Sequence, residues 1–361
     1  MAVLEPETLA DPVALTRALV DIESVSGNEA EIADAVEAAV RTAPHLTVRR
    51  AGNTVVASTD LGRPGRVVLA GHLDTVPVAE NLPSTVDGDI MHGCGTSDMK
   101  SGVAIALWLA ISVSEPRLDV TYFFYDCEEV ESYRNGLRNI ALEHPDWLAA
   151  DFAILLEPTY GLVEGGCQGS MKAWVSTTGK RAHSARSWHG VNAIHAASGI
   201  LDRLKEYQPR RVVIDGCEYR EGMNAVRVQG GIASNVIPDR CRIEVNYRFA
   251  PDRSGDEAVR HIHEVFDGYE VEVTDVAPGA LPGLSAPAAQ EFLGVVGKPP
   301  IGKFGWTDVA RFAEIGIPAL NYGPGDPNLA HSRQERVELS KIRSGADTMR
   351  AWLTGETGGV G

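Results

Sequence analysis

The chain has 361 residues, which at about 150 residues per domain is enough for two domains. It carries 33 Lys and Arg against 49 Asp and Glu, a formal net charge of −16, and its 44% hydrophobic and 23% charged residues exclude a collagen, a coiled coil and a disordered chain. The acidic balance argues against nucleic acid as a partner, since phosphate backbones require a basic surface, but it leaves a small anionic substrate open.

No apolar run approaches the roughly 20 residues that a membrane span needs, and the acidic segment 1–11 lacks the basic start of a secretory signal. Five cysteines form no C-x-x-C pair and are expected to be free thiols: Cys94, Cys127, Cys167, Cys217 and Cys241. Free thiols are typical of a reducing compartment, so the sequence predicts a cytoplasmic protein without a membrane partner.

The first part of the chain alternates predicted helices and strands. Leu15, Leu19 and Ile22 have helical spacing, and Asn28 is a candidate cap for a second helix over 29–40. Apolar runs then predict strands at 66–70, 120–125 and 152–156, and helices at 100–112 and 136–142. Strands separated by helices indicate an α/β fold with a mostly parallel sheet covered on both faces.

The pattern changes near Gly169. The next segments predict four largely antiparallel strands with two helices: strands at 171–179, 225–230, 240–249 and 269–273, and helices at 192–207 and 256–266. After a Pro- and Gly-rich linker over 277–287, a strand at 318–322 rejoins the α/β pattern, and the tail after Gly355 is expected to fray. We therefore predict an α/β domain over 1–168 and 279–361, interrupted by an α+β domain over 169–278.

Possible metal ligands follow each predicted strand of the α/β part. They are His72 and Asp74 after the first strand, Glu128 and Glu129 after the second, Glu157 after the third, His331 after the fourth, and Asp98 at the end of a glycine loop. Because open α/β sheets bind ligands beyond the carboxyl ends of their strands, we expect these side chains to converge.

A set of His, Asp and Glu without Cys suits zinc, cobalt or manganese in a hydrolytic site. Two imidazoles and several carboxylates are enough for two ions about 3.5–4 Å apart, with one carboxylate bridging them. In the pair Glu128 and Glu129, one glutamate can bind metal while the other acts as general base on a water.

Each of these signals has an ordinary structural explanation when it is taken alone. A histidine after a strand is often structural, and the adjacent glutamates suit a solvated helix start. The loop at Gly93 imitates a dinucleotide fingerprint but has Asp98 in place of the third glycine. His183 lies in a basic loop that is either solvated or functional. The common position of the acids and imidazoles at strand ends favours a metal centre.

Four motifs resemble those of the dinuclear-zinc aminoacylase/carboxypeptidase family of metallohydrolases: 69–77 (LAGHLDTVP), 95–102 (GTSDMKSG), Glu128-Glu129 and the late His331. The resemblance covers essentially the whole chain. It implies a zinc-exopeptidase-like catalytic domain split around a four-stranded, two-helix lid domain through which the protein forms a homodimer.

The resemblance also implies a role for each site residue. His72 and Glu157 would hold one zinc or cobalt ion, Glu129 and His331 the other, and Asp98, with a cis peptide to Met99, would bridge them. Asp74 would orient His72, and Glu128 would activate the water between the metals. From the lid, the resemblance implies His183 of the partner subunit as the oxyanion donor and Asn235, Arg248 and Arg186 as substrate contacts, and Thr307 of the second catalytic segment is a further expected contact.

Glu157 and the segments 181–188, 304–312 and 321–327 resemble the succinyl-diaminopimelate desuccinylase branch of this family in its actinobacterial form. One departure is the segment 167–170, which lacks the basic residue of the enterobacterial form and leaves Arg186 or Arg248 to neutralise the succinyl end. The expected reaction is hydrolysis of N-succinyl-LL-2,6-diaminopimelate to succinate and LL-2,6-diaminopimelate. The alternatives are acetylornithine deacetylase or another N-acyl-amino-acid deacylase or carboxypeptidase of the family.

Overall fold

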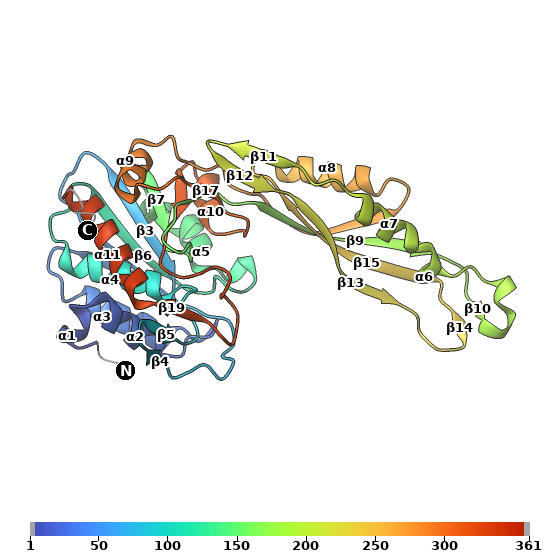
Figure 1. Cartoon of the computed structure of the whole chain (residues 1–361), viewed down its shortest axis with the longest axis horizontal. Helices are drawn as coiled ribbons and strands as arrows, with labels where there is room; N and C mark the ends of the chain where they lie inside the picture. Colours follow the sequence, from blue (N-terminus) through green and yellow to red (C-terminus); the bar gives the residue numbers. More distant parts are fainter. Residues whose placement is uncertain (1–3, 357–361) are drawn as a thin grey trace. The chain divides into compact units, whose positions relative to one another are not determined.

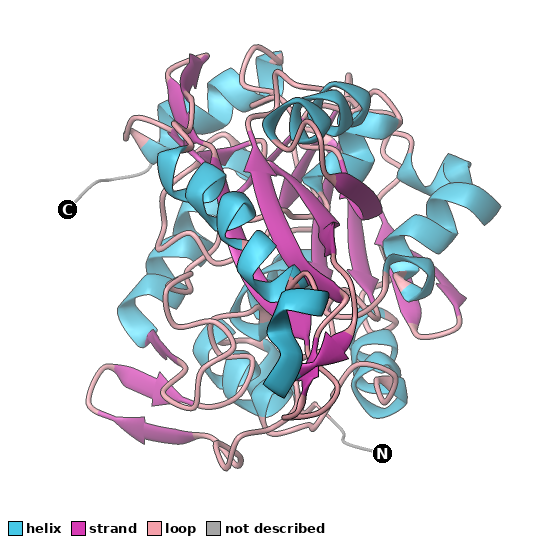
Figure 2. Ribbon diagram, turned by 90° about the vertical axis from the view of Figure 1, so that its right-hand side faces the viewer, coloured by secondary structure: helices cyan, strands magenta, loops and turns pink. Residues whose placement is uncertain are grey.

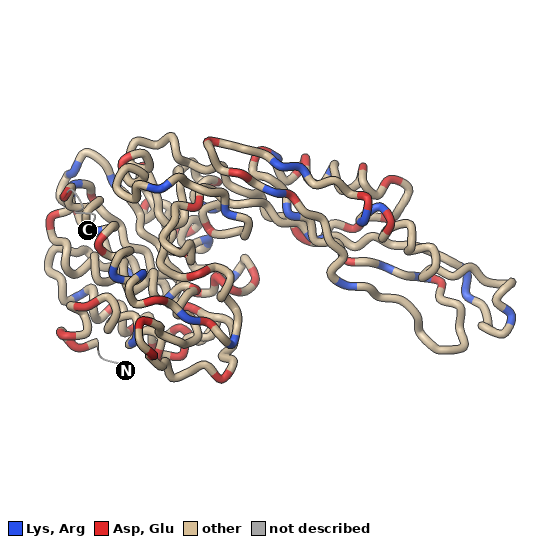
Figure 3. The backbone as a smooth tube through the Cα atoms, viewed as in Figure 1, with Lys and Arg blue, Asp and Glu red and all other residues tan. Residues whose placement is uncertain are grey.

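The computed structural model describes residues 4–356 and divides them into two compact units. Within the described residues, unit 1 comprises residues 4–165, 282–301 and 311–356, and unit 2 comprises residues 166–281 and 302–310. Figure 1 labels many of the helices and strands of both units, and Figure 3 shows acidic and basic residues distributed along each. The predicted fraying of the tail concerns residues that lie, from 357 onward, outside the described part of the chain.

Unit 1 is built on a mixed eight-stranded sheet in the order β1-β2-β6-β3-β7-β18-β8-β17. Its four central strands are parallel, and β1, β2 and β8 join antiparallel. The strands are β1 Thr47–Ala51, β2 Thr54–Ser58, β3 Arg66–His72, β6 Asp119–Tyr125, β7 Phe152–Leu155, β8 Glu164–Gly165, β17 Ile301–Gly302 and β18 Ala319–Asn321. This confirms the predicted α/β class with a mostly parallel centre.

The central strands are buried because both faces of the sheet are covered. In β6 every residue is buried, and in β3 only Arg66 is not. Helix α4 (Lys100–Ser112) is apolar around most of its circumference and packs against β3 and several helices, as an enclosed helix must. The other helices of unit 1 are α1 Pro6–Leu9, α2 Pro12–Val20, α3 Ala30–Val40, η1 Ser132–Arg134, α5 Gly136–Glu143, η2 Pro145–Leu148, α9 Pro287–Val296, α10 Val309–Glu314 (which begins in unit 2) and α11 Leu339–Thr354.

A small three-stranded sheet completes unit 1, in the order β19-β5-β4. Its strands are β4 Thr85–Asp87, β5 Ile90–His92 and β19 Arg336–Glu338. The pairing of β5 with β19 brings the chain around residue 92 against the chain around residue 336. The glycine loop that follows β5 is therefore anchored by the C-terminal part of the sequence.

Unit 2 is built on a four-stranded antiparallel sheet in the order β13-β15-β9-β16. The strands are β9 Gly169–Thr178, β13 Gly222–Gly230, β15 Arg240–Phe249 and β16 Glu270–Ala277, and the helices are α6 Ala193–Ala196, α7 Ser198–Glu206 and α8 Gly255–Val265. Alternate residues of β15, among them Ile243 and Val245, form one core with Ile200 of α7 and Ile262 of α8. Figure 2 separates strands from helices by colour.

Two short two-stranded sheets extend unit 2. Strand β10 (Ala182–His183), which runs into the 3₁₀ helix η3 (Ser184–His189), pairs with β14 (Val236–Ile237), and β11 (Arg211–Ile214) pairs with β12 (Cys217–Arg220). At the edge of the main sheet, β13 is exposed from Asn224 to Gly230. Exposed apolar side chains on this edge strand include Val226 and Val228.

The predicted cap of the second helix is wrong. Helix α3 begins at Ala30, and its N-cap residue is Glu29, not Asn28. The Glu29 carboxylate turns back to accept a hydrogen bond from the backbone N–H of Gly27 at 2.6 Å, so that the turn before the helix is closed by Glu29. Ile22 also falls outside the opening helix, which ends at Val20. Within the described residues there is no helix long and apolar enough to span a membrane.

Candidate metal centre

The carboxyl ends of four unit 1 strands position the candidate ligands. His72 is the last residue of β3, and Glu157 follows β7 by two residues. After β6, Cys127 takes a positive φ of 57°, a left-handed turn that directs the next two residues, Glu128 and Glu129. His331 follows β18 and also has a positive φ, of 59°. Residues almost 260 positions apart in the sequence therefore meet at one edge of the sheet.

Asp98 lies between two groups of possible ligands. The first comprises His72, Asp98 and Glu157, the second Asp98, Glu129 and His331, and in each group the ligand atoms lie within 4.8 Å of one another. One Asp98 oxygen is 3.1 Å from Nε2 of His72, and the other is 3.4 Å from Nε2 of His331. The peptide bond between Asp98 and Met99 is cis. A single carboxylate thus faces both imidazoles, the arrangement that two bridged cations require.

Glu128 also faces the cluster. One of its oxygens lies within 4.8 Å of ligand atoms of His72 and Glu129. Its backbone N–H and that of Glu129 both donate to the Asp74 carboxylate, at 3.0 and 3.1 Å. The two glutamates are therefore fixed at the backbone by one buried acid, while their side chains reach the cluster.

Charge and donor chemistry both fit divalent cations. Four carboxylates and two imidazoles offer hard oxygen and borderline nitrogen donors, and no cysteine belongs to these groups. Hydrogen bonds to Asp98 and Glu129 raise the pKa of His331 to about 10. Burial opposes protonation of His72, but hydrogen bonds to Asp74 and Asp98 outweigh it and raise the pKa of His72 well above its usual value. The acids thus attract positive charge, which protons or metal ions can supply.

Asp74 supports the cluster through its backbone as well as its side chain. Its carbonyl oxygen lies 3.0 Å from Nδ1 of His72, and one of its carboxylate oxygens lies 3.5 Å from the same atom. The hydroxyl of Ser26, which sequence reasoning missed, donates to the Asp74 carboxylate at 2.6 Å. Fixing Nδ1 leaves Nε2 of His72 directed at Asp98, as a metal-binding imidazole requires.

Glu335 is the second residue that sequence reasoning missed. Its buried carboxylate accepts hydrogen bonds from the backbone N–H groups of Gly95, Ser97 and Asp98 at 2.9–3.0 Å. Burial raises its pKa to about 7. Its position four residues after His331 was the available signal, but a lone acid after a loop has no recognisable sequence pattern. Glu335 ties the loop that carries Asp98 to the segment that carries His331.

We expect Glu335→Ala to lower the affinity for divalent metal by about tenfold or more, because three backbone N–H donors of the Asp98 loop lose the carboxylate that accepts from them. Unfolding free energy should fall by about 3 kcal/mol for the same reason. Titration of metal-free protein with zinc and thermal unfolding measure the two effects. Glu338→Ala, a nearby surface control, should change metal affinity little. Unaltered zinc affinity in Glu335→Ala would contradict the role of Glu335.

The predicted lid residues all belong to unit 2. His183 ends β10, is exposed, and accepts a hydrogen bond from Ala185 N–H through Nδ1 at 3.0 Å. Asn235 lies beside it, because its carbonyl oxygen accepts from Ser184 N–H at 2.9 Å. Arg186 is exposed in η3. His183, Asn235 and Arg186 thus lie together at the β10–β14 strand pair.

Arg248 and Thr307 lie elsewhere in unit 2. Arg248 is half-buried on β15, opposite Ser170 of β9, and burial lowers its pKa. Thr307 is buried, and its carbonyl oxygen faces the Cys167 thiol at 3.7 Å. The structure therefore does not place Arg248 and Thr307 at the β10–β14 strand pair that carries His183.

The sequence matches the description "Peptidase family M20/M25/M40" over residues 68–354. A Mycobacterium tuberculosis protein, named provisionally as succinyl-diaminopimelate desuccinylase DapE, is 58% identical over 96% of this chain and 98% of its own length. The succinyl-diaminopimelate desuccinylase of Corynebacterium glutamicum is 48% identical over 96% of this chain and 97% of its own length.

Two solved structures share the fold at low sequence identity. A tripeptidase from Staphylococcus aureus (SAV1512) superposes with a TM-score of 0.77 at 22% identity, covering 96% of this chain and 98% of its own. The Bacillus subtilis YXEP protein, described as a dinuclear metal binding peptidase, superposes with a TM-score of 0.71 at 19% identity, covering 98% and 99%. These likenesses establish the fold of the whole chain.

Proposed function

Because this chain belongs to peptidase family M20/M25/M40, we propose that it is a metal-dependent hydrolase that cleaves N-succinyl-LL-2,6-diaminopimelate to succinate and LL-2,6-diaminopimelate. The observation that carries the proposal is the cluster of His72, Asp98 and Glu128 at the sheet edge. It stands in a chain 48% identical, nearly end to end, to a protein named for that reaction. The same relatives favour this reading over acetylornithine deacetylase.

The ligand set we propose holds two zinc or cobalt ions per subunit. His72 and Glu157 would hold one ion, Glu129 and His331 would hold the other, and Asp98 would be shared by both; these residues form the two groups of possible ligands described above. The description of the YXEP protein as dinuclear supports the number of ions. When bound, such ions polarise an amide carbonyl and lower the pKa of water.

The proton transfers fall to Glu128. As general base, its carboxylate takes a proton from the attacking water, and as general acid it returns that proton to the leaving amine. Its backbone bond to Asp74 keeps it in place during both steps. His183 of the partner subunit donates to the oxyanion of the tetrahedral intermediate. Arg248, Arg186, Asn235 and Thr307 are the proposed contacts to substrate, with an arginine fork suited to each carboxylate.

A direct comparison of substrates tests the reaction. The zinc-loaded protein is assayed at steady state with N-succinyl-LL-2,6-diaminopimelate and with N-acetylornithine. We expect kcat/KM to favour the succinyl substrate by at least about a hundredfold, because its succinyl carboxylate, which the acetyl group lacks, adds a charge-assisted contact. A preference for the acetyl substrate would replace the proposal with the alternative deacylase.

We propose that unit 2 acts as the lid and dimerisation domain, with β13 as the dimer edge. An exposed strand edge with apolar side chains is suited to pairing with a second copy. In particular, Val226 and Val228 are 59% and 67% exposed on that strand. Placement in the cytoplasm is likewise a proposal, which five free and buried cysteines support.

Val228→Asp is expected to convert the dimer to a monomer, since it places like charges face to face across the paired edge. Light scattering measures the mass, and circular dichroism checks the fold. Val213→Asp serves as the matched control, because Val213 is 69% exposed on β11 rather than on β13. A Val228→Asp protein that stays dimeric would move the interface away from β13.

A further inference from the structure

A cavity of about 190 Å³ lies on the sheet of unit 1, away from the candidate metal centre. Its lining includes Arg66, the first residue of β3, whereas His72 is the last residue of the same strand. At about 3.3 Å per residue the two Cα atoms are roughly 20 Å apart. The cavity is therefore separate from the proposed catalytic site, and it is smaller than the pockets of about 300–1,000 Å³ that take drug-sized ligands.

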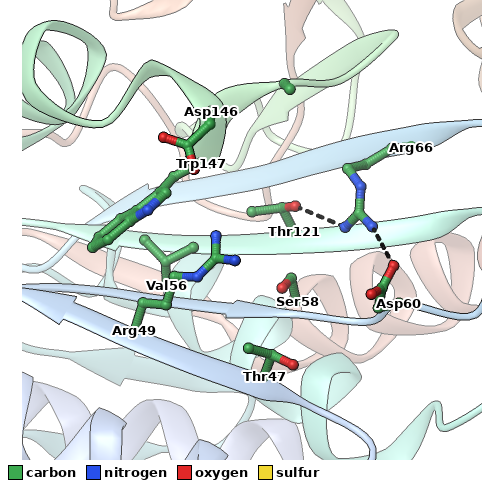
Figure 4. A pocket seen from close by; sticks show the side chains of 10 residues that line it. Thr47, Arg49, Val56, Ser58, Asp60, Arg66, Thr121, Asp146 and Trp147 are labelled. Atoms are coloured by element: carbon green, nitrogen blue, oxygen red, sulfur yellow. Dashed lines mark hydrogen bonds and ion pairs between the residues drawn. The ribbon is translucent and has the colours of Figure 1, made fainter.

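Three hydroxyl side chains form a row across the floor of this cavity. Thr47 of β1 pairs with Ser58 of β2, and Ser58 pairs with Thr121 of β6. Directly opposed residues on antiparallel strands point to the same face, so the three hydroxyls share one side of the sheet. Figure 4 shows Thr47, Ser58 and Thr121 in this order. Neighbouring hydroxyl groups in such a row, about 5 Å apart, can donate to one oxyanion.

Two arginines flank the row. The guanidinium of Arg49 lies over the indole ring of Trp147, 5.7 Å from the ring centroid. Among residues 4–356 no carboxylate forms an ion pair with Arg49, in a chain that has 49 acidic residues. Stacking on the indole holds the guanidinium in place while leaving its N–H donors available.

The N–H donors of the Arg66 guanidinium are also only partly engaged in hydrogen bonds. Its one side-chain hydrogen bond goes to the hydroxyl of Thr121 at 3.2 Å. Asp60 and Asp119 lie 3.7 and 3.9 Å from it, beyond hydrogen-bond distance. The Asp119 carboxylate already accepts hydrogen bonds from the hydroxyl of Thr59 and two backbone N–H groups. Arg66 thus keeps donors for a further anion.

The two acids that line the cavity do not cancel this charge. Asp60 is 88% exposed, and Asp146 is exposed at the rim in η2. Solvent screens both carboxylates and also the exposed Arg49, whereas Thr121 is buried at the floor and Arg66 is only 27% exposed. Binding should therefore be governed by the guanidinium and hydroxyl donors rather than by the rim acids.

We propose that this cavity is a binding site for a small oxyanion, a phosphate or carboxylate group, held by the guanidinium groups of Arg49 and Arg66 over the hydroxyl row. Guanidinium forks match the planar carboxylate and the tetrahedral phosphate, and charge-assisted bonds of this kind are the strong ones. The site goes beyond the proposed hydrolysis and does not depend on it.

Calorimetric titration of the metal-loaded full-length protein with inorganic phosphate, and separately with malonate, tests this site. We expect Arg49→Gln to lower the affinity for the anion by about tenfold, because one charge-assisted pair is lost. Arg66→Gln and Thr121→Val should weaken it in the same direction. Arg343→Gln is the matched control, since Arg343 is exposed on α11 and does not line the cavity. Hydrolytic activity without added anion should be unchanged in Arg49→Gln.

The site is supported if the pocket variants lose binding of phosphate or malonate while Arg343→Gln keeps it. The anion whose binding is lost shows whether the site takes a phosphate or a carboxylate group. Three outcomes overturn it. The first is no binding of either anion by the unaltered protein at millimolar concentration. The second is that Arg49→Gln and Thr121→Val bind the anion as tightly as the unaltered protein does, which would place the anion at the metal centre. The third is equal weakening in Arg343→Gln, which indicates unspecific charge. If Arg66→Gln fails to fold, Arg49→Gln and Thr121→Val decide the question.

Discussion

Glu128→Gln is expected to lower kcat by about a thousandfold or more while leaving the metal content near two ions per chain. The amide keeps the size of the side chain but cannot accept a proton from water. The backbone bond from residue 128 to Asp74 does not involve the side chain and should survive. Steady-state turnover and elemental analysis of the purified protein measure the two quantities.

The two readouts separate a base from a ligand. Glu128 lies within 4.8 Å of ligand atoms of His72 and Glu129, so geometry alone allows either role. Parallel loss of metal and turnover would make Glu128 a ligand, and retained turnover would refute the assignment as base. Glu143→Gln is the matched control, because Glu143 is exposed at the end of α5 and should leave both quantities unchanged.

Asp98→Asn should release much of the bound metal and lower kcat by about a thousandfold, since its carboxylate faces both imidazoles. The distances of 3.1 Å to His72 and 3.4 Å to His331 place it between the two proposed ions. An amide bridges two cations poorly, because it brings no negative charge. Metal content per chain and turnover at saturating zinc are the measurements.

The number of ions that bind more weakly distinguishes a bridging carboxylate from an ordinary ligand. If Asp98 bridges, both ions should bind more weakly in Asp98→Asn, whereas an ordinary ligand would affect only one. Asp87→Asn, on the exposed strand β4, is the control for the loss of one negative charge. A variant that keeps two tightly bound ions would exclude the bridging role.

Sequence reasoning located the buried elements best. Strand β6 and helix α4 are nearly continuous apolar runs, and the predicted bounds differ from the observed ones by at most one residue. The edge strand β1 and its neighbour β2 were not predicted: β1 alternates half-buried and exposed residues with two arginines, and β2 is short. Strands of this kind are stabilised by their neighbours, which the local sequence does not reveal.

The cap of α3 was missed for a similar reason. Asn is a common N-cap residue, so Asn28 was the natural choice. The competing contact is between the Glu29 side chain and Gly27, and the same carboxylate also receives Cys127 N–H at 3.3 Å from the far strand β6. A contact over 98 residues overrides the local preference.

In the candidate site, the acids and imidazoles could be predicted because they follow strands that can be recognised from their apolar sequence. Their supports could not. Ser26 and Glu335 act through Asp74 and through backbone N–H groups, and neither contact leaves a pattern in the sequence. The arginine-flanked cavity was invisible as well, since its hydroxyl row exists only through the register of three strands.

The bonds from Glu335 to the loop at Gly95 join residues 240 positions apart. During synthesis, the ribosome must therefore release the chain at least as far as Glu335 before the loop of Asp98 receives its final support. Until then the emerging chain presents a group of uncompensated acids. Binding of a divalent cation at the proposed centre should thus come late in the folding of the nascent protein, and a truncation that removes the chain from residue 332 onward should abolish it.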